Sequence, residues 1–168
     1  MPTYVLSRDI VIQQWGYVIE QGAGNDKMVM DSVKQMIEDA NLPGVTCRQT
    51  DVSAGGLFGR KRAFLLATLN TLKDYRMFIG ARDVGAHLEA SWFMTVAPGF
   101  MKRSMSKRAF GNPQALSMQI PIFDQQDLNT WIGIAEHCVE KAVKTLMEEL
   151  KQDPSGLNTK SKGFLQLW

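Results

Sequence analysis

The C-terminal third of the chain carries an amphipathic pattern that constrains the fold more than any other feature of the sequence. Apolar residues recur there at helical spacing and form one continuous stripe, with charged residues opposite. The stripe consists of Leu128, Trp131, Ile132, Ala135, Cys138, Val139, Ala142, Val143, Leu146, Met147 and Leu150. We expect a helix that starts at Asp124 or Asp127 and ends at Asp153-Pro154. A stripe of this length needs a broad apolar surface to cover it.

The segment from Val45 to Val96 can supply that surface, because its apolar residues follow a period of two. Four stretches read as strands: VTCRQTDVS, KRAFLLATLN, YRMFIGARD and AHLEASWFMTV. The last two are joined around Val84-Gly85, which predicts a hairpin. Its pairing places Met77, Ile79, Ala81, Leu88, Ala90 and Trp92 on one face, which we expect to be the core.

The N-terminal part completes a single domain. Residues 3–21 fit both helical and alternating patterns, and their β-branched and aromatic residues favour a strand. A shorter helix is expected near 26–40, capped by Asn25 or Asp26. The sequence therefore predicts one two-layer α+β domain over residues 1–153. Its antiparallel sheet, a meander of about four strands plus an N-terminal strand, is covered by the long C-terminal helix and the shorter helix. This order is similar to that of the TBP-like and helix-grip folds, a topological likeness that implies no function.

The sequence also leads to predictions about the cellular compartment, about cofactors and about the C-terminal tail. The N-terminus lacks the pattern of a secretory signal and no apolar run approaches the ~20 residues of a spanning helix, so we expect a cytoplasmic protein without a transmembrane segment. Cys47 and Cys138 lack zinc or redox spacing and are interpreted as small core hydrophobes. We find no motif for a metal or cofactor and expect none. Residues 154–168 form a tail whose apolar end predicts docking on the domain or on a neighbouring subunit, and the second alternative would make the protein a homo-oligomer. That end consists of Phe164, Leu165, Leu167 and Trp168.

The charge of the chain is unevenly distributed. Residues 55–110 contain ten Lys and Arg against three Asp and Glu, a net charge of +7, whereas the rest of the chain carries −5. Two stretches combine cations with apolar residues: GGLFGRKR and APGFMKRSMSKRAFGN. Such a combination is typical of a surface that contacts a nucleic acid, an anionic membrane or an acidic protein. The same residues also fit a solvated face whose apolar members close one end of the core.

We therefore predict a non-enzymatic binding module that engages a polyanion, with nucleic acid favoured and an anionic membrane surface as the alternative. The predicted contact cations are Arg60, Lys61, Arg62, Arg76, Arg82, Lys102, Arg103, Lys107 and Arg108. The predicted apolar contacts are Leu57, Phe58, Phe100, Met101 and Met105. Phe78 and Phe93, on the outer sheet face with Arg76 and Arg82, are expected to offer rings on which bases can stack.

Two other function classes remain open at this level. One is a small-molecule protein or enzyme with a cavity between helix and sheet, in which the hairpin brings Arg82, His87 and Glu89 together, with His87 across from Arg82. A cross-strand charge pair explains the same three residues without catalysis. The glycine loop QGAGN before the shorter helix could present backbone N–H groups to a phosphate or serve only as a helix entry. The other class is an assembly subunit held by its tail and loop tips.

Overall fold

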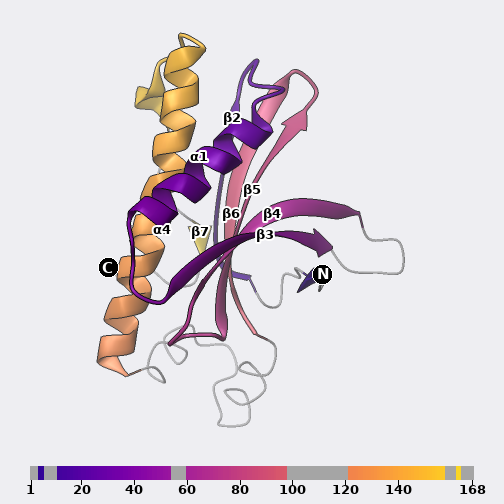
Figure 1. Cartoon of the computed structure of the whole chain (residues 1–168). Coiled ribbons are helices and arrows are strands. Elements are labelled where there is room, and N and C mark those ends of the chain that lie inside the picture. The colour runs from indigo at the N-terminus through magenta and orange to yellow at the C-terminus, as the bar shows by residue number, and fades with distance from the viewer. Residues whose placement is uncertain (1–3, 6–10, 54–59, 98–120, 158–161, 164–168) are drawn as a thin grey trace.

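The computed structural model shows an α+β fold in which two helices lie on one face of a curved sheet (Figure 1). The structure describes residues 4–5, 11–53, 60–97, 121–157 and 162–163. The elements in chain order are β1 (Tyr4–Val5), β2 (Val11–Ile19), α1 (Asp26–Asp39), β3 (Val45–Ser53), β4 (Lys61–Leu69), β5 (Tyr75–Val84), β6 (His87–Val96), α4 (Ile122–Glu149), the 3₁₀ turn η1 (Pro154–Gly156) and β7 (Lys162–Gly163).

The sheet has the strand order β1-β3-β4-β5-β6-β2-β7. Its five long strands pair antiparallel, as the sequence predicts, and β3 to β6 form the expected meander. The short strand β1 pairs parallel to β3, which makes the sheet mixed. At the opposite edge Lys162–Gly163 of the tail pair with Gln13 and Gln14 of β2.

The core lies between the sheet and the helices. Strand residues that alternate toward the helices are buried, among them Leu65, Met77 and Trp92. The predicted stripe of α4 is buried from Leu128 to Met147, which confirms that it faces the core. The sheet covers it as expected, and α1 packs against α4 as well. Cys138 is buried in this core and Cys47 packs against it, as expected for small hydrophobes. Leu157, after η1, also belongs to the core.

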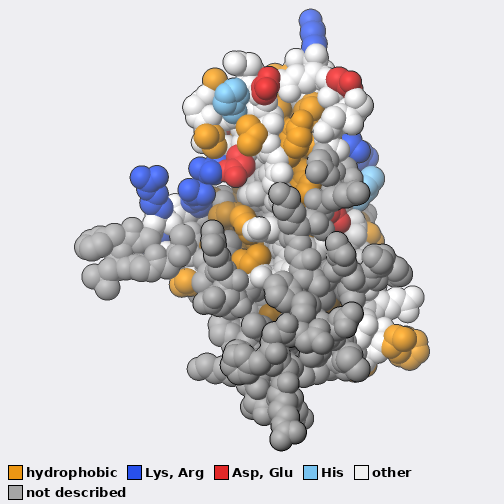
Figure 2. Space-filling view, turned by 180° about the vertical axis from the view of Figure 1, so that it is seen from behind, with side chains coloured by type: hydrophobic (Ala, Val, Ile, Leu, Met, Phe, Trp, Pro, Cys, Tyr) orange, Lys and Arg blue, Asp and Glu red, His pale blue; other side chains and the backbone are white. Residues whose placement is uncertain are grey.

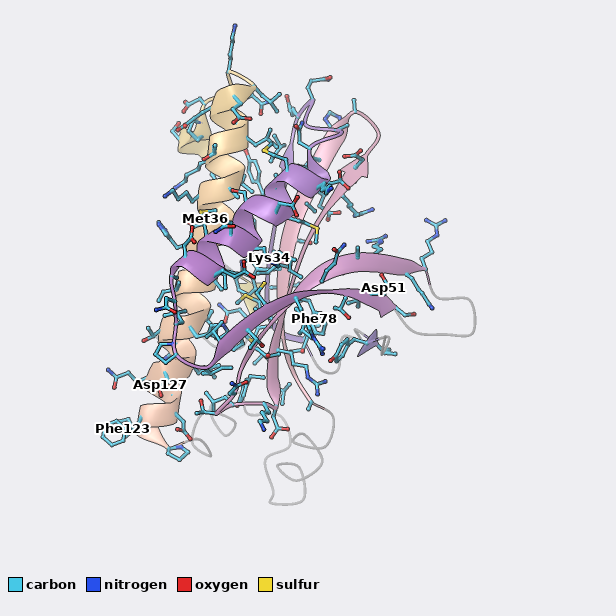
Figure 3. All side chains as sticks on the ribbon, viewed as in Figure 1. Lys34, Met36, Asp51, Phe78, Phe123 and Asp127 are labelled. Atoms are coloured by element: carbon cyan, nitrogen blue, oxygen red, sulfur yellow. The ribbon has the colours of Figure 1, made fainter. Side chains whose placement is uncertain are left out.

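The long helix begins earlier than predicted. It starts at Ile122, with Pro121 as its N-cap, and the Gln125 N–H donates to the Pro121 carbonyl at 3.0 Å. Proline suits a helix start because its fixed φ matches the first turn and its missing N–H has no helical partner there. The first two side chains, Ile122 and Phe123, are about three-quarters exposed, and Phe123 projects away from the end of the helix (Figure 3).

The hairpin between β5 and β6 has the predicted faces but a different register. Ile79 pairs with Trp92 on the core face, and Arg82 pairs with Glu89 on the outer face. The expected position of His87 across from Arg82 is wrong, since His87 pairs with Val84. The loop consists of Gly85 and Ala86, and Gly85 has a φ of +63° that glycine adopts without strain.

The outer face of the sheet carries a second, smaller apolar cluster. Val52, Phe64, Leu66 and Phe78 are buried in it, with Tyr4 and Phe93 packed against them. Tyr4 of β1 meets Phe78 edge to face with ring centroids 5.5 Å apart. Arg48 donates to the Tyr4 hydroxyl at 2.9 Å, and Arg76 lies 5.3 Å from the Tyr4 ring centroid. These contacts explain how a two-residue strand is held over the cluster.

The partly buried carboxyl of Glu136 leads to a prediction about how the stability of the protein depends on pH. Burial on α4, and then the nearby Glu140, raise the pKa of this carboxyl from 4.5 to about 6. The folded state therefore holds this proton more tightly than the unfolded chain, so this contribution to stability falls as the pH rises from 4.5 to about 6. We expect Glu136→Gln to raise the Tm at pH 7.5 and to leave it unchanged at pH 4.5, measured by thermal denaturation.

The matched control is Glu148→Gln, which changes an exposed side chain of the same helix. A gain in Tm at pH 7.5 that is equally large for the control, or a Glu136→Gln gain that is the same at both pH values, would contradict the burial explanation.

Candidate functional site

Strands β4 and β5 pair over only part of their length. Their ladder runs from Thr68–Arg76 to Leu65–Ile79 and ends there. Beyond that point β4 continues beside β3 to Lys61, and β5 continues beside β6 to Val84. The two halves of the sheet therefore diverge (Figure 1).

Phe64 and Gly80 lie where the strands part. In the register of the ladder Phe64 is the next residue opposite Gly80, and its ring covers this glycine. A Cβ added to Gly80 would come within 2.6 Å of the ring, so glycine is required by close approach. The ring also meets Phe93 edge to face, with centroids 6.1 Å apart.

The divergence opens a cleft of about 910 Å³ between the two halves of the sheet and α1. This volume lies within the range of small-molecule and cofactor sites. Its lining comes from α1 (Asp26, Lys27, Met30, Asp31, Lys34), β3 (Gln49, Val52), Arg60 and β4 (Arg62, Ala63, Phe64, Leu65), β5 (Gly80, Ala81, Arg82) and β6 (Glu89, Ser91, Phe93). Figure 3 shows Lys34 on the side of α1 that faces β3 and β4.

The charges in the cleft are mixed, and part of the positive charge is already paired. Lys34 forms an ion pair with Glu38 at 2.8 Å, and Arg82 contacts Glu89 through its guanidinium. Lys27, Arg60 and Arg62 are exposed and form no ion pair with any residue that the structure describes. Seen from the face away from the helices, Lys and Arg side chains gather where β4 begins, with hydrophobic side chains beside them (Figure 2).

The structure brings together some of the predicted contact cations and separates others. Arg60, Arg62 and Arg82 line the cleft, whereas Lys61 and Arg76 do not. Arg76 lies over the Tyr4 ring instead. Lys102, Arg103, Lys107 and Arg108 lie outside the described residues, as do the predicted apolar contacts Leu57, Phe58, Phe100, Met101 and Met105. The apolar end of the tail, Phe164, Leu165, Leu167 and Trp168, also lies outside them.

One sequence-based expectation about this face is wrong, and of the two interpretations of the hairpin residues the structure shows the cross-strand charge pair. Phe78 cannot offer its ring to a base, because it is 2% exposed and lies under Tyr4. The Arg82, His87 and Glu89 cluster is reduced to the Arg82–Glu89 pair. His87 instead accepts a hydrogen bond through Nδ1 from the Gln21 N–H at 3.4 Å.

The glycine loop before α1 contacts a carboxylate of its own chain. The Gly24 N–H donates to both carboxylate oxygens of Asp83, at 3.0 and 3.1 Å. Asp83 therefore occupies the position that a phosphate on this N–H would take. The loop acts as a helix entry tied to the β5–β6 hairpin.

The described residues offer little to nucleophilic or metal chemistry. Burial raises the pKa of the Cys47 thiol to about 11 and also raises that of Cys138, so neither is a thiolate at neutral pH. Within the described ranges, no three His, Cys, Asp or Glu side chains are grouped closely enough to hold a metal ion. In the same part of the chain, none of the helices combines the length and apolar character needed to cross a membrane.

Sequence reasoning missed two features of the cleft: the residues that α1 contributes to its lining, and the contact between Phe64 and Gly80 where β4 and β5 part. Lys27, Met30 and Lys34 recur at spacings of three and four, which places them on one face of the helix. That stripe is readable in the sequence. A glycine within the apolar strand run YRMFIGARD was the second available signal, since glycine in a strand often marks a close approach.

Comparison of the chain with protein-family models, with curated proteins and with solved structures found no match.

The Phe64–Gly80 contact generates a prediction about stability. Gly80→Ala would push a methyl group into a ring that is 8% exposed and packed against Phe93, so both must shift. We expect a loss of about 1–3 kcal/mol in the free energy of unfolding, measured by urea denaturation.

Gly133→Ala is the matched control, because Gly133 lies within α4 and an added Cβ meets no atom within 4 Å. This change should raise stability by up to about 1 kcal/mol. Equal effects of the two substitutions would show that the ring contact carries no constraint.

Proposed function

We propose that the protein is a non-enzymatic binding module that holds an anionic partner in the cleft between β4, β5 and α1. The observation that carries this proposal is the placement of Lys27, Arg60 and Arg62. All three line the cleft and are exposed, and none has an ion pair among the described residues. Cations that are not neutralised within the protein retain their attraction for a ligand charge.

The composition of the walls favours binding over catalysis. Met30, Val52, Phe64 and Phe93 supply apolar surface, and exposed cations line the same cleft, which suits a ligand with both apolar and acidic parts. Ser91 is a lining hydroxyl, yet neither a His nor a Cys lines the cleft beside it. The nearby Glu89 is committed to Arg82.

Two features weigh against nucleic acid as the partner. The Phe78 ring is buried, and the Phe64 ring is fixed between Gly80 and Phe93. A membrane is a flat surface, whereas this site is concave. We therefore include a nucleic acid and a membrane surface as comparison probes in the test.

The test uses ¹⁵N-labelled protein with three probes: poly-glutamate, a 20-nucleotide single-stranded DNA, and vesicles of phosphatidylserine and phosphatidylcholine. We expect poly-glutamate to shift the amide signals of Lys27, Arg60 and Arg62, and the shifts to weaken when salt rises from about 50 to about 500 mM. The double variant Arg60→Glu, Arg62→Glu should weaken the affinity roughly tenfold or more, about 1.4 kcal/mol or more.

Lys141→Glu is the control, because Lys141 is exposed on α4 and does not line the cleft. It should bind poly-glutamate as the unmodified protein does. The proposal would be overturned if none of the probes shifted the cleft signals, or if the double variant and the control behaved alike.

A further inference from the structure

Among the residues that the structure describes, the cleft contains a strand edge without a partner. From Lys61 to Phe64 the chain has β3 on one side, while its ladder with β5 has already ended on the other. Successive residues of a strand direct their N–H and C=O groups alternately to its two sides. Alternate residues of this segment therefore present a backbone donor and acceptor to the cleft, where no described strand pairs with them.

From this edge we propose that the anionic partner is an extended, acidic polypeptide segment that adds a strand along β4. The inference rests on the proposed function and names the chemistry of the ligand. In this mode of recognition main-chain hydrogen bonds supply affinity and the flanking side chains supply specificity. The free edge of four residues, Lys61 to Phe64, corresponds to roughly 13 Å of strand.

The surroundings of the edge specify which side chains such a segment needs. Its residues would alternate between the two faces of the sheet. On the outer face they meet Arg60 and Arg62, which favours acidic residues there. On the helix face they meet Met30 and the exposed Ala63, where a small apolar residue fits. The preferred pattern therefore alternates Glu or Asp with a residue such as Val.

The edge also discriminates between polypeptide and nucleic acid. It offers C=O acceptors as well as N–H donors, at the spacing of a strand. A peptide backbone has a complementary donor for each acceptor, whereas a phosphodiester has acceptors only. The acidic side chains of Asp26 and Asp31 lie on α1, on the side where the peptide presents apolar residues. A segment of alternating character thus keeps its acidic side chains away from Asp26 and Asp31, while Lys27 and Lys34 of the same helix face its apolar side.

The test uses a blocked seven-residue peptide that alternates Glu and Val, and two N-methylated versions of it. One version carries N-methyl groups on the valines and the other on inner glutamates, with equal numbers of methyl groups and the same charge. Because alternate residues face the same strand edge, only one version loses the N–H groups that would pair with β4. Affinity is measured by fluorescence anisotropy, and amide hydrogen exchange of residues 61–64 is followed by NMR.

We expect the unmodified peptide to bind and one N-methylated version to lose affinity about tenfold or more, while the other stays within about threefold. Exchange should slow at alternate residues between 61 and 64. Equal behaviour of the two versions, whether both bind or both fail, would overturn strand addition. Binding of poly-glutamate without binding of this peptide would do the same and leave the proposed function standing. If none of the probes bound at the cleft, both strand addition and the proposed function would be overturned.

Discussion

Burial of the α4 stripe is the constraint on which the rest of the structure depends. Trp131 and Leu146 are fully buried against a sheet face that carries Trp92, so this face has to remain apolar along every long strand. A shift of one residue in any strand would exchange its two faces, and this requirement therefore fixes the register. The outer face of the sheet carries only the smaller apolar cluster. In the described part of the chain this cluster is covered by β1 and not by a helix.

The cleft is a consequence of how unequally the two halves of the sheet are held. Both helices contribute to the core under β2, β5 and β6. Among the described residues, the outer end of β4 pairs only with β3, the outer end of β3 pairs with β4 and the short strand β1, and both pack beneath Tyr4. Phe64 fills the angle between the halves by lying on Gly80. An unpaired edge invites association with other strands, and charged residues are a usual defence. Arg60, Lys61 and Arg62 at this edge repel another cationic edge and attract an acidic one.

The sequence predicted what depends on local periodicity and failed where contacts between distant residues decide. The four strand stretches and the α4 stripe follow from spacing alone, and the structure confirms them. The hairpin register depends on which two residues form the loop, and the pairing of Val84 with His87 leaves Gly85 and Ala86 as that loop. The cleft arises from Phe64 meeting Gly80, sixteen positions away, which no local pattern encodes. Burial of Phe78 depends on Tyr4, which lies near the N-terminus, far from Phe78 in the sequence.

The cleft contains charges of both signs, so it selects a ligand by where the acidic groups of that ligand lie more than by the net charge of the ligand. A uniformly negative ligand gains attraction from Arg60, Arg62 and Lys27 but meets repulsion from Asp26 and Asp31, which lie on the same helix as Lys27. A ligand whose acidic groups all lie on one side avoids this repulsion by turning that side to β4. Unfavourable juxtaposition excludes wrong partners as effectively as attraction selects right ones. The carboxylates of α1 thus orient a bound segment, and the arginines beside β4 hold it.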